Sequence, residues 1–387
     1  MIKRRIALDI AHTGFVENYR IEAALGVIEY ARQHTHWQLL CNEQNLSLTN
    51  KFTRYSDLER LDVEGIIFSF WAKGKHRHIQ ELGVPAVSIS NDYPGQASPY
   101  SCVVSDDVQI GRIAAEHFLE RGFRDLGFYG DLSLRWEAKR WIGFRSVVEA
   151  AGLKCHVRAR GVEISSRQEA VALREWLKSL PKPIAILCAN DPRALHILEA
   201  CQPLGFEVPR HIALIGVDNS PLICEAQLPS ISSIELDPRK AGYEAAALLD
   251  RMLEEGRQLR EEITIPPRGV VTRMSTDVLA VDDEPVTLAL LFIRDRAQEP
   301  IQIKDVVRAS GVSRSTLERR FRERLSSTIN DMLRQRRLET AKQLLLKSKM
   351  SLEDIARASG FRRSTYLCNV FQEEYGTTPR EWRQRYE

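Results

Sequence analysis

Polar and aromatic residues that could bind a small molecule recur through the first 275 residues of this 387-residue chain. Carboxylate and amide side chains can hydrogen-bond pairs of hydroxyl groups, and an aromatic ring can stack on the C–H face of a polyhydroxylated molecule. Residues of these types that follow apolar runs are His12, Thr13, Phe15, Trp71, Asn91, Asp92, Asp131, Asn190, Asp191, Asp218 and Asn219. As a set they predict a site for a polyhydroxylated ligand.

Each of these residues also has an ordinary structural role that competes with ligand binding. Asp and Asn side chains routinely cap helices, and a single tryptophan such as Trp71 or Trp136 is more often part of a core. Arg140, a further candidate, could equally form a surface ion pair. The hypothesis of a ligand site therefore rests on the whole set and on where its members lie.

The elements that would position these residues are alternating strands and helices. Helical periodicity, as in residues 19–33, alternates with short apolar or β-branched runs, which are residues 5–10, 37–41, 65–70, 86–90, 126–129, 185–188 and 213–217. Such alternation predicts parallel sheets with helices on both faces. Because ligands of such folds bind at the carboxyl ends of the strands, the candidate residues lie where a site is expected.

A second set of chemistry-bearing residues lies in an internal repeat near the C-terminus. Residues 305–316 (DVVRASGVSRST) return 49 positions later as residues 354–365 (DIARASGFRRST). In each copy a short amphipathic helix ends at a glycine, Gly311 or Gly360, and a second helix follows. Glycine permits the positive-φ turn between two steeply crossing helices, so each copy predicts a helix-turn-helix unit.

The second helix of each copy combines an apolar face with an arginine-rich outer face. The apolar side chains are Leu317, Phe321 and Leu325 in the first copy and Leu367, Val370 and Phe371 in the second. The outer side chains are Arg314, Ser315, Glu318, Arg319 and Arg322, then Arg362, Arg363, Ser364, Thr365 and Asn369. Such side chains read base edges in the major groove and bind phosphates. Double-stranded DNA is the predicted partner, with a structural or protein-binding role as the alternative.

Local signals and charge agree with this interpretation. Residues 328–349 predict one long helix that sets the spacing of the two units, and Ser313 and Ser351 are placed to cap helices, Ser351 with Asp354 in a capping box. Thr378-Pro379-Arg380-Glu381 is a strong helix start. Residues 285–387 hold 21 Lys and Arg against 13 Asp and Glu, a net charge of +8, and the rest of the chain carries −5. A basic domain on an acidic body indicates a polyanionic partner for that domain alone.

The C-terminal region resembles the AraC/XylS family of bacterial transcription regulators over roughly residues 287–385. The ordered motifs that carry the resemblance are RLxxAxxLL (337–345), IAxxxGF (355–361) and FxxxYGxTPxxWR (371–383). It implies two recognition helices in successive major grooves, with Ser315, Glu318 and Arg319, then Thr365 and Asn369, at base-reading positions. The family more often has an arginine near Asn369 and a basic residue near Gln372. The resemblance therefore implies a weaker or differently tuned second contact.

The preceding region resembles the sugar-sensing core of LacI/GalR regulators and of periplasmic sugar-binding proteins across residues 4–275. The motifs are VxDxxxxGxxAxxHxxxxG (104–122), RxxGF (140–144), ANDxxA (189–194), VPxxIALIGVD (208–218) and PxIxSI (229–234). In that family the residues matching Arg140, Asn190 and Asp218 contact the ligand. Asp106 is expected to brace a turn instead.

The order of the two regions departs from LacI relatives, in which the DNA-binding headpiece comes first. With the sensor first, and with RxSTD at 273–277, the chain resembles the bacterial activators of xylose operons along its whole length. The resemblance implies D-xylose or a related monosaccharide as effector, activation of a pentose catabolic operon, a homodimer, and RNA polymerase as a partner of an activator. A sensor of another monosaccharide acting as repressor or dual regulator is the alternative.

The expected organisation is an α/β, two-lobed sensor of the type I periplasmic-binding-protein class over residues 1–275, a linker over 276–286 and an all-α double helix-turn-helix domain over 287–387. The full predicted ligand set is Arg140, Asn190, Asp191, Asp218, His12, Phe15, Trp71 and Asp92. These residues are expected to bind the sugar, and the outer faces of the two second helices are expected to bind DNA.

Other classes of protein find little support in the sequence. There is no P-loop, no GxSxG motif and no zinc-ligand spacing, and the pairs His34-x-His36 and His76-x-His78 are typical of solvated positions, so no enzyme, cofactor or metal site is expected. The seven scattered cysteines predict reduced thiols. The apolar run after Lys3-Arg4-Arg5 is too short for a signal peptide, and no stretch approaches a membrane span. A cytoplasmic protein without a membrane partner is expected.

Overall fold

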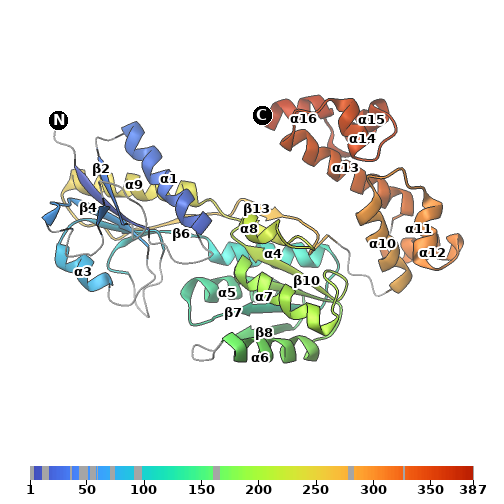
Figure 1. The fold of residues 1–387 in the computed structure, drawn as a ribbon, viewed down its shortest axis with the longest axis horizontal. Coiled ribbons are helices and arrows are strands. Elements are labelled where there is room, and N and C mark those ends of the chain that lie inside the picture. Colours follow the sequence, from blue (N-terminus) through green and yellow to red (C-terminus); the bar gives the residue numbers. More distant parts are fainter. Residues whose placement is uncertain are drawn as a thin grey trace. The chain divides into compact units, whose positions relative to one another are not determined.

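The computed structural model describes residues 4–10, 17–34, 37–42, 51–52, 58, 60–69, 75–90, 98–159, 166–277, 283–325 and 327–386. The chain divides into two compact units, Met1–Thr276 and Asp277–Glu387, which are described separately (Figure 1). The first unit is α/β and the second is all-α, which confirms the predicted fold class. Among the described helices, none is long and apolar enough to cross a membrane.

The first sheet has seven strands in the order β12-β6-β5-β4-β1-β2-β3, and every neighbouring pair is parallel. Its strands are β1 (Arg5–Asp9), β2 (Gln38–Asn42), β3 (Lys51–Phe52), β4 (Gly65–Phe68), β5 (Ala86–Ser88), β6 (Ser101–Ser105) and β12 (Glu262–Ile265). The central strands are continuous apolar runs because both faces are covered. Helices α1 (Glu17–His34) and α9 (Pro238–Glu255) pack on one face, and α3 (Lys75–Leu82) packs on the other.

The second sheet has six strands in the order β13-β11-β10-β9-β7-β8, all parallel except the edge pair β11 and β13. Its strands are β7 (Leu126–Gly130), β8 (Cys155–Ala159), β9 (Ile184–Cys188), β10 (Ile212–Val217), β11 (Ser232–Glu235) and β13 (Gly269–Val271). The flanking helices are α4 (Asp107–Glu120), α5 (Arg135–Ala150), α6 (Ser166–Ser179), α7 (Asp191–Cys201) and the short α8 (Pro221–Cys224). Helices α6 and α7 share one core with the sheet, and α4 and α5 pack on β7 and β9.

The chain passes between the two sheets three times. It leaves the first sheet after β6, returns after β11 into α9, and leaves again between β12 and β13. Two sheets joined in this way form two lobes, and the residues at the crossings lie between them. Asp106, at the first crossing, caps α4 by accepting a hydrogen bond from the backbone N–H of Gln109 at 2.9 Å. Its role in bracing a turn is as expected.

The second unit contains two similar three-helix groups joined by one long helix. Its helices are α10 (Glu284–Arg296), α11 (Ile303–Ser310), α12 (Arg314–Leu325), α13 (Ile329–Lys347), α14 (Leu352–Ala358), α15 (Ser364–Tyr375) and α16 (Pro379–Tyr386). Gly311 and Gly360 adopt φ angles of 72° and 84° in the turns before α12 and α15, as the repeat predicts. Separate cores lie under each group, and α13 contributes Leu333 to the first and Leu338 to the second. The predicted long helix is therefore present, as α13, and joins the two helix-turn-helix groups within the second unit.

The predicted helix caps also form. The hydroxyl of Ser313 accepts from the backbone of Thr316 at 3.3 Å, and that of Ser351 accepts from the backbone of Asp354 at 3.2 Å. The Ser351 hydroxyl also donates to the Asp354 carboxylate at 2.6 Å, so Ser351 caps the helix, and the reciprocal bond of the predicted capping box is not among those of the described residues. Thr378 and Glu381 bond reciprocally at the start of α16, at 2.8 and 3.3 Å. These bonds satisfy backbone N–H groups that a helix start otherwise leaves unpaired.

Gly143 controls how closely α5 approaches α4. A Cβ atom at this position would lie 1.9 Å from the backbone oxygen of Val108. We expect Gly143→Ala to lower the free energy of unfolding by about 1–3 kcal/mol, because the backbone cannot yield as a side chain can. Chemical denaturation measures the change, with Arg145→Ala on the exposed side of α5 as control. An unchanged or raised stability would mean that the two helices have room to separate.

Candidate ligand pocket and nucleic-acid interface

A pocket lies at the carboxyl ends of the strands of the first unit, between its two sheets. Residues from both lobes and from the crossings line it: Tyr19, Arg20, Ser69, Ile89, Ser90, Val104, Ser105, Asp107, Arg135, Trp136, Lys139, Arg140, Asn190, Asp218 and Leu236. The lining combines hydroxyl, amide and charged groups with two aromatic rings. This is the composition expected for a polyhydroxylated ligand.

Arg140 is held rigidly at the pocket wall. Its Nε donates to a carboxylate oxygen of Asp107 at 2.9 Å, and its Nη1 donates to the backbone oxygen of Ala189 at 2.5 Å. The guanidinium lies over the ring of Trp136, 4.6 Å from the ring centroid, and the side chain is 4% exposed. Its second terminal nitrogen, Nη2, has no partner among the described residues. A fixed, charged donor is thus available to a ligand hydroxyl.

Asp107 pairs with this arginine from the first turn of α4. Burial raises the pKa of Asp107, and the adjacent guanidinium opposes that shift. Asp107 immediately follows the helix cap, so α4 directs it into the pocket while Asp106 remains outside the lining. Only Asp106 was singled out from the sequence, so its functional neighbour was missed.

Asp218 lies directly after β10 in a turn of unusual backbone geometry. Asp218 and Asn219 have φ angles of 106° and 50°, in the left-handed region that non-glycine residues seldom adopt. Such geometry persists only where the surroundings enforce it, and it is concentrated at binding sites. Burial raises the pKa of Asp218 to about 8; the Arg140 guanidinium lowers it, and the carboxylates of Asp191 and Asp107 add to the increase.

This raised pKa predicts that ligand binding depends on pH. Ligand hydroxyls that donate to the carboxylate favour its ionised form, so binding releases a proton when Asp218 is protonated. Affinity should therefore rise between pH 6 and 8, by at most about tenfold per unit, and level off above. Isothermal titration calorimetry across this range measures it. The Asp218→Asn variant should bind more weakly with little pH dependence, and an equal dependence in that variant would assign the effect to another group.

The adjacent residues Asn190 and Asp191 differ in whether they reach the pocket. Asn190 caps α7 by accepting from the backbone of Arg193 at 3.1 Å and also lines the pocket. Asp191 is fully buried, and its two carboxylate oxygens accept from the backbone of Ser220 at 2.8 Å and from the hydroxyl of Ser233 at 2.6 Å. It is not among the described residues that line the pocket. The structure places it as a brace beneath the Asp218 turn, because both oxygens are already engaged.

The other predicted ligand residues, His12, Phe15, Trp71 and Asp92, lie outside the described residues. Residues that were not predicted from the sequence include Tyr19, Ser69 and Ser90, which line the pocket from the first lobe. Burial raises the pKa of Tyr19 to about 12, so its hydroxyl remains neutral. The sequence feature that could have indicated Tyr19, Ser69 and Ser90 is their proximity to the ends of predicted strands and helices.

The outer face of α12 presents the arginines that the first repeat predicts. Leu317 and Phe321 are fully buried, and Arg314, Ser315 and Arg319 are exposed. Arg314 pairs with Glu318 at 2.8 Å, and Arg319 pairs with Glu323 at 2.8 Å. Exposed pairs of this kind contribute little stability. These arginines can therefore exchange their partners for phosphates or base edges at small cost.

The second recognition helix, α15, begins directly after two exposed arginines, Arg362 and Arg363. Ser364 is the first residue of the helix and is half-buried, and Thr365 and Asn369 are exposed. Tyr366 was not predicted, yet its side chain is 53% exposed. An exposed aromatic ring beside Thr365 adds an apolar surface suited to a thymine methyl group.

Arg337 connects the helix-turn-helix units. From α13 its Nε donates to the backbone oxygen of Ala297 at 2.8 Å, and its Nη2 donates to that of Glu299 at 3.1 Å. Gly360 approaches the same place, since a Cβ atom there would lie 2.2 Å from the oxygen of Ala297. Together these contacts fix the second turn against the end of α10, and so limit how the two recognition helices are spaced.

Two families match separate parts of the chain. Residues 115–276 match the periplasmic binding protein-like domain, and residues 306–385 match a helix-turn-helix domain. The first match includes Arg140, Asn190 and Asp218, and the second includes both recognition helices.

Similar proteins extend over nearly the whole length. The xylose operon regulatory protein of Escherichia coli (strain K12) is 30% identical over 374 residues, 94% of each chain. That of Haemophilus influenzae is 30% identical over 349 residues, 88% of this chain and 90% of its own. A solved structure of a xylose-binding transcription activator, xylR, shares 29% identity with a TM-score of 0.72, covering 100% of this chain and 99% of its own. A LacI family regulator from Enterococcus faecium with bound ribose shares the sensor fold, with a TM-score of 0.55 and 17% identity over 72% of this chain and all of its own.

Proposed function

Because the chain belongs to the family of the xylose operon regulatory proteins, which are sugar-responsive, DNA-binding transcription regulators, we propose that its effector is D-xylose or a close pentose. The observation that carries this proposal is the arrangement around Arg140. A buried guanidinium, whose Nη2 has no partner among the described residues, lines the pocket with Asp218 and lies on the Trp136 ring. Donor, acceptor and aromatic surface together suit the hydroxyls and C–H face of a monosaccharide.

The contributing residues have distinct proposed roles. Arg140 donates to a ring or hydroxyl oxygen, Asp218 accepts from one or two hydroxyls, and Asn190 uses the amide hydrogens that its helix-capping oxygen leaves free. Asp107 keeps the guanidinium in place. The proposed DNA contacts all lie in the second unit. In its first helix-turn-helix group they are Arg314, Ser315, Glu318 and Arg319, and in its second group they are Arg362, Arg363, Ser364, Thr365 and Asn369, with Tyr366 beside them.

The proposed mechanism is a change of state driven by the sugar. Sugar binding between the lobes favours a closed sensor, and closure changes how the DNA-binding units of a homodimer are presented to the operator. Only a difference in sugar affinity between two states can drive such a change, and the usual coupling is about 1–3 kcal/mol. We propose activation of a pentose catabolic operon through contact with RNA polymerase. Repression, or both modes, would use the same sensor.

A thermal-shift panel of pentoses and hexoses on the purified chain tests the effector assignment. A ligand that binds only the folded state raises the melting temperature in proportion to the logarithm of its concentration. D-xylose is expected to produce the largest shift, with L-arabinose, D-ribose, D-glucose and D-galactose as comparison sugars. A larger shift with another member of the panel would reassign the effector, and no shift with any sugar would contradict a sugar sensor.

A further inference from the structure

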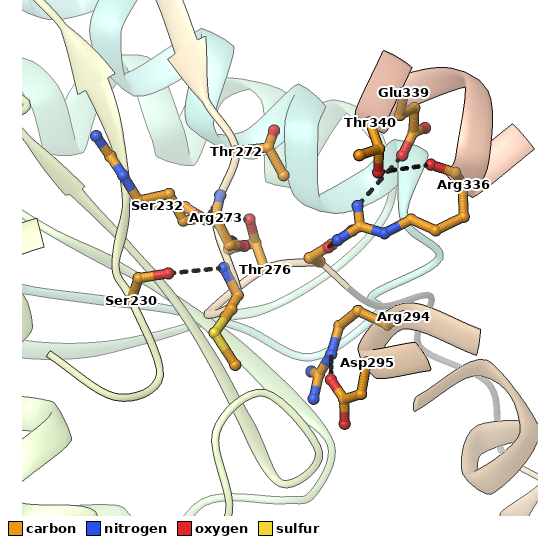
Figure 2. A network of polar contacts seen from close by, with 12 residues as sticks. Ser230, Ser232, Thr272, Arg273, Thr276, Arg294, Asp295, Arg336, Glu339 and Thr340 are labelled. Atoms are coloured by element: carbon orange, nitrogen blue, oxygen red, sulfur yellow. Dashed lines mark hydrogen bonds and ion pairs between the residues drawn. The ribbon is translucent and has the colours of Figure 1, made fainter. Parts of the chain in front are cut away.

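The last residue of the sensor unit, Thr276, is held in a buried polar network. Its hydroxyl donates to the Oγ of Ser232 at 2.7 Å and accepts from Nε2 of His117 at 2.9 Å. Thr276 and Ser232 are fully buried, and His117 is 6% exposed. Figure 2 shows Thr276 beside Ser232 and Arg273. The side chain that ends this unit is therefore fixed by specific bonds rather than by general packing.

The proton positions in this network follow from the partners. The hydroxyl of Ser232 donates to the backbone oxygen of Arg273 at 3.0 Å, so it accepts from Thr276, and the hydroxyl of Thr276 must then accept from His117. Burial, together with the charge of Arg121, lowers the pKa of His117 to about 3, so the ring is neutral and carries its proton on Nε2. The bonds run in one direction, from His117 through Thr276 and Ser232 to Arg273.

Two connections join this network to the ligand pocket. The first is α4, whose first residue, Asp107, pairs with Arg140 in the pocket and whose later turn carries His117. The second is Arg273, whose Nη2 donates to the side-chain oxygen of Asn219 at 2.7 Å. Asn219 is the second residue of the left-handed turn that presents Asp218 to the pocket. Both connections start at pocket residues and meet at Thr276.

The residue after Thr276 belongs to the second unit. Within that unit Asp277 forms an ion pair with Arg336 of α13 at 2.5 Å. Helix α13 carries both helix-turn-helix groups. The peptide bond between residues 276 and 277 thus links two anchored residues. Thr276 is hydrogen-bonded within the sensor, and Asp277 is paired with α13, the helix that sets the spacing of the two recognition helices.

We propose that Thr276 is the residue through which occupancy of the pocket is passed to the DNA-binding unit, by way of Asn219, Arg273 and Ser232 on one side and α4 with His117 on the other. This rests on the proposed function, since it assigns the path of the same sugar response. The turn of Asp218 and Asn219 has positive φ angles that are costly for non-glycine residues, and in this proposal ligand contacts at Asp218 bias the turn toward one of two arrangements.

The first test uses the full-length protein and labelled upstream DNA, with and without D-xylose. Thr276→Val keeps the side-chain shape but loses both hydrogen bonds. It should bind sugar and sugar-free DNA within about twofold of the unmodified protein, yet lose the sugar-dependent change in DNA affinity. Ser230→Ala is the matched control: Ser230 lies two residues before Ser232, and among the described residues its hydroxyl has a hydrogen bond only from the backbone N–H of Met274, at 3.5 Å. A full response in Thr276→Val, or loss of sugar binding in that variant, overturns the proposal.

His117 provides a second pair of variants should Thr276→Val fold poorly. Glutamine can place an N–H donor near the position of Nε2, and leucine cannot. The sugar response should survive in His117→Gln and disappear in His117→Leu, with sugar affinity retained in both. Equal responses in the two variants contradict a role for the bond to Thr276.

A sugar-free measurement separates this proposal from the effector assignment. Asn219→Gly keeps the left-handed backbone and removes the acceptor for Arg273. Amide hydrogen exchange at Ser275 to Asp277 should become at least about tenfold faster if the network is coupled. If amide hydrogen exchange becomes faster only near residue 219, the proposed connection from Asn219 to Thr276 is overturned, whatever sugar the protein binds. A lack of response to every sugar in the unmodified protein would instead count against the proposed function.

Discussion

Replacing Arg140 by lysine is expected to weaken sugar binding about ten- to a hundredfold, because a charge-assisted hydrogen bond contributes about 1.5–3 kcal/mol. Lysine keeps a positive charge beside the buried carboxylate of Asp107, so the variant avoids leaving that charge without compensation. It cannot hold Asp107 and the oxygen of Ala189 and still offer a third, directed donor to the ligand. DNA binding without sugar should be unchanged.

The matched control is Arg145→Lys, one helical turn and a half further along α5. Arg145 is exposed and pairs with Glu149 at 3.6 Å, away from the pocket. Calorimetric sugar titrations of both variants give the comparison. A sugar affinity in Arg140→Lys equal to that of Arg145→Lys would show that the guanidinium does not contact the ligand.

Arg319→Ala is expected to cost about 1–3 kcal/mol of binding at the preferred DNA site and to relax sequence preference at one base position. Arg319 lies on the outer face of α12 with its side chain 61% exposed, and its partner Glu323 lies on the same exposed helix surface. Breaking this pair costs little, so the free arginine can form a bidentate contact with guanine. Selection of bound sequences from a randomised pool, before and after substitution, reveals the position.

Arg322→Ala is the appropriate comparison, because Arg322 is exposed on the same helix. Removing a phosphate-binding side chain there should weaken binding to all sequences alike and reduce the slope of log affinity against log salt by about 1. If Arg319→Ala also weakens binding to all sequences equally, with the motif unchanged, Arg319 binds a phosphate and base reading by α12 must come from Ser315 or Glu318.

The DNA-binding unit was predictable in detail because its signals are local. The 49-residue repeat, the two glycines and the caps at Ser313, Ser351 and Thr378 act over a few residues, and each recurs in the structure. Strands β1, β2, β4, β5, β7, β9 and β10 were predicted for the same reason, as apolar runs. Strands β3, β6, β8, β11, β12 and β13 were not predicted: β3 and β13 are very short, β8 and β12 are partly exposed and mixed in polarity, and β6 and β11 include serines.

The candidate pocket was only partly predictable, because it depends on contacts between distant segments. Resemblance supplied Arg140, Asn190 and Asp218, which the structure brings to one pocket. No local pattern distinguishes Asp107 from Asp106, since helix geometry alone directs one into the pocket and the other to a cap. The position of Asp191 beneath the turn was not predictable, because Ser220 and Ser233, which satisfy its oxygens, lie 29 and 42 residues away. The bond between His117 and Thr276 spans 159 residues, so no sequence pattern could reveal it.

The measurement that tests the central claim most directly is a DNA-binding titration of the full-length protein with and without D-xylose. Fluorescence anisotropy on DNA from upstream of its own gene gives both affinities, and repetition at several salt concentrations establishes that phosphates are bound. We predict a difference of about fivefold to 150-fold between the two affinities, the range of ordinary allosteric coupling, and its loss in Arg140→Lys. Equal affinities with every pentose and hexose tested would contradict a sugar-responsive regulator.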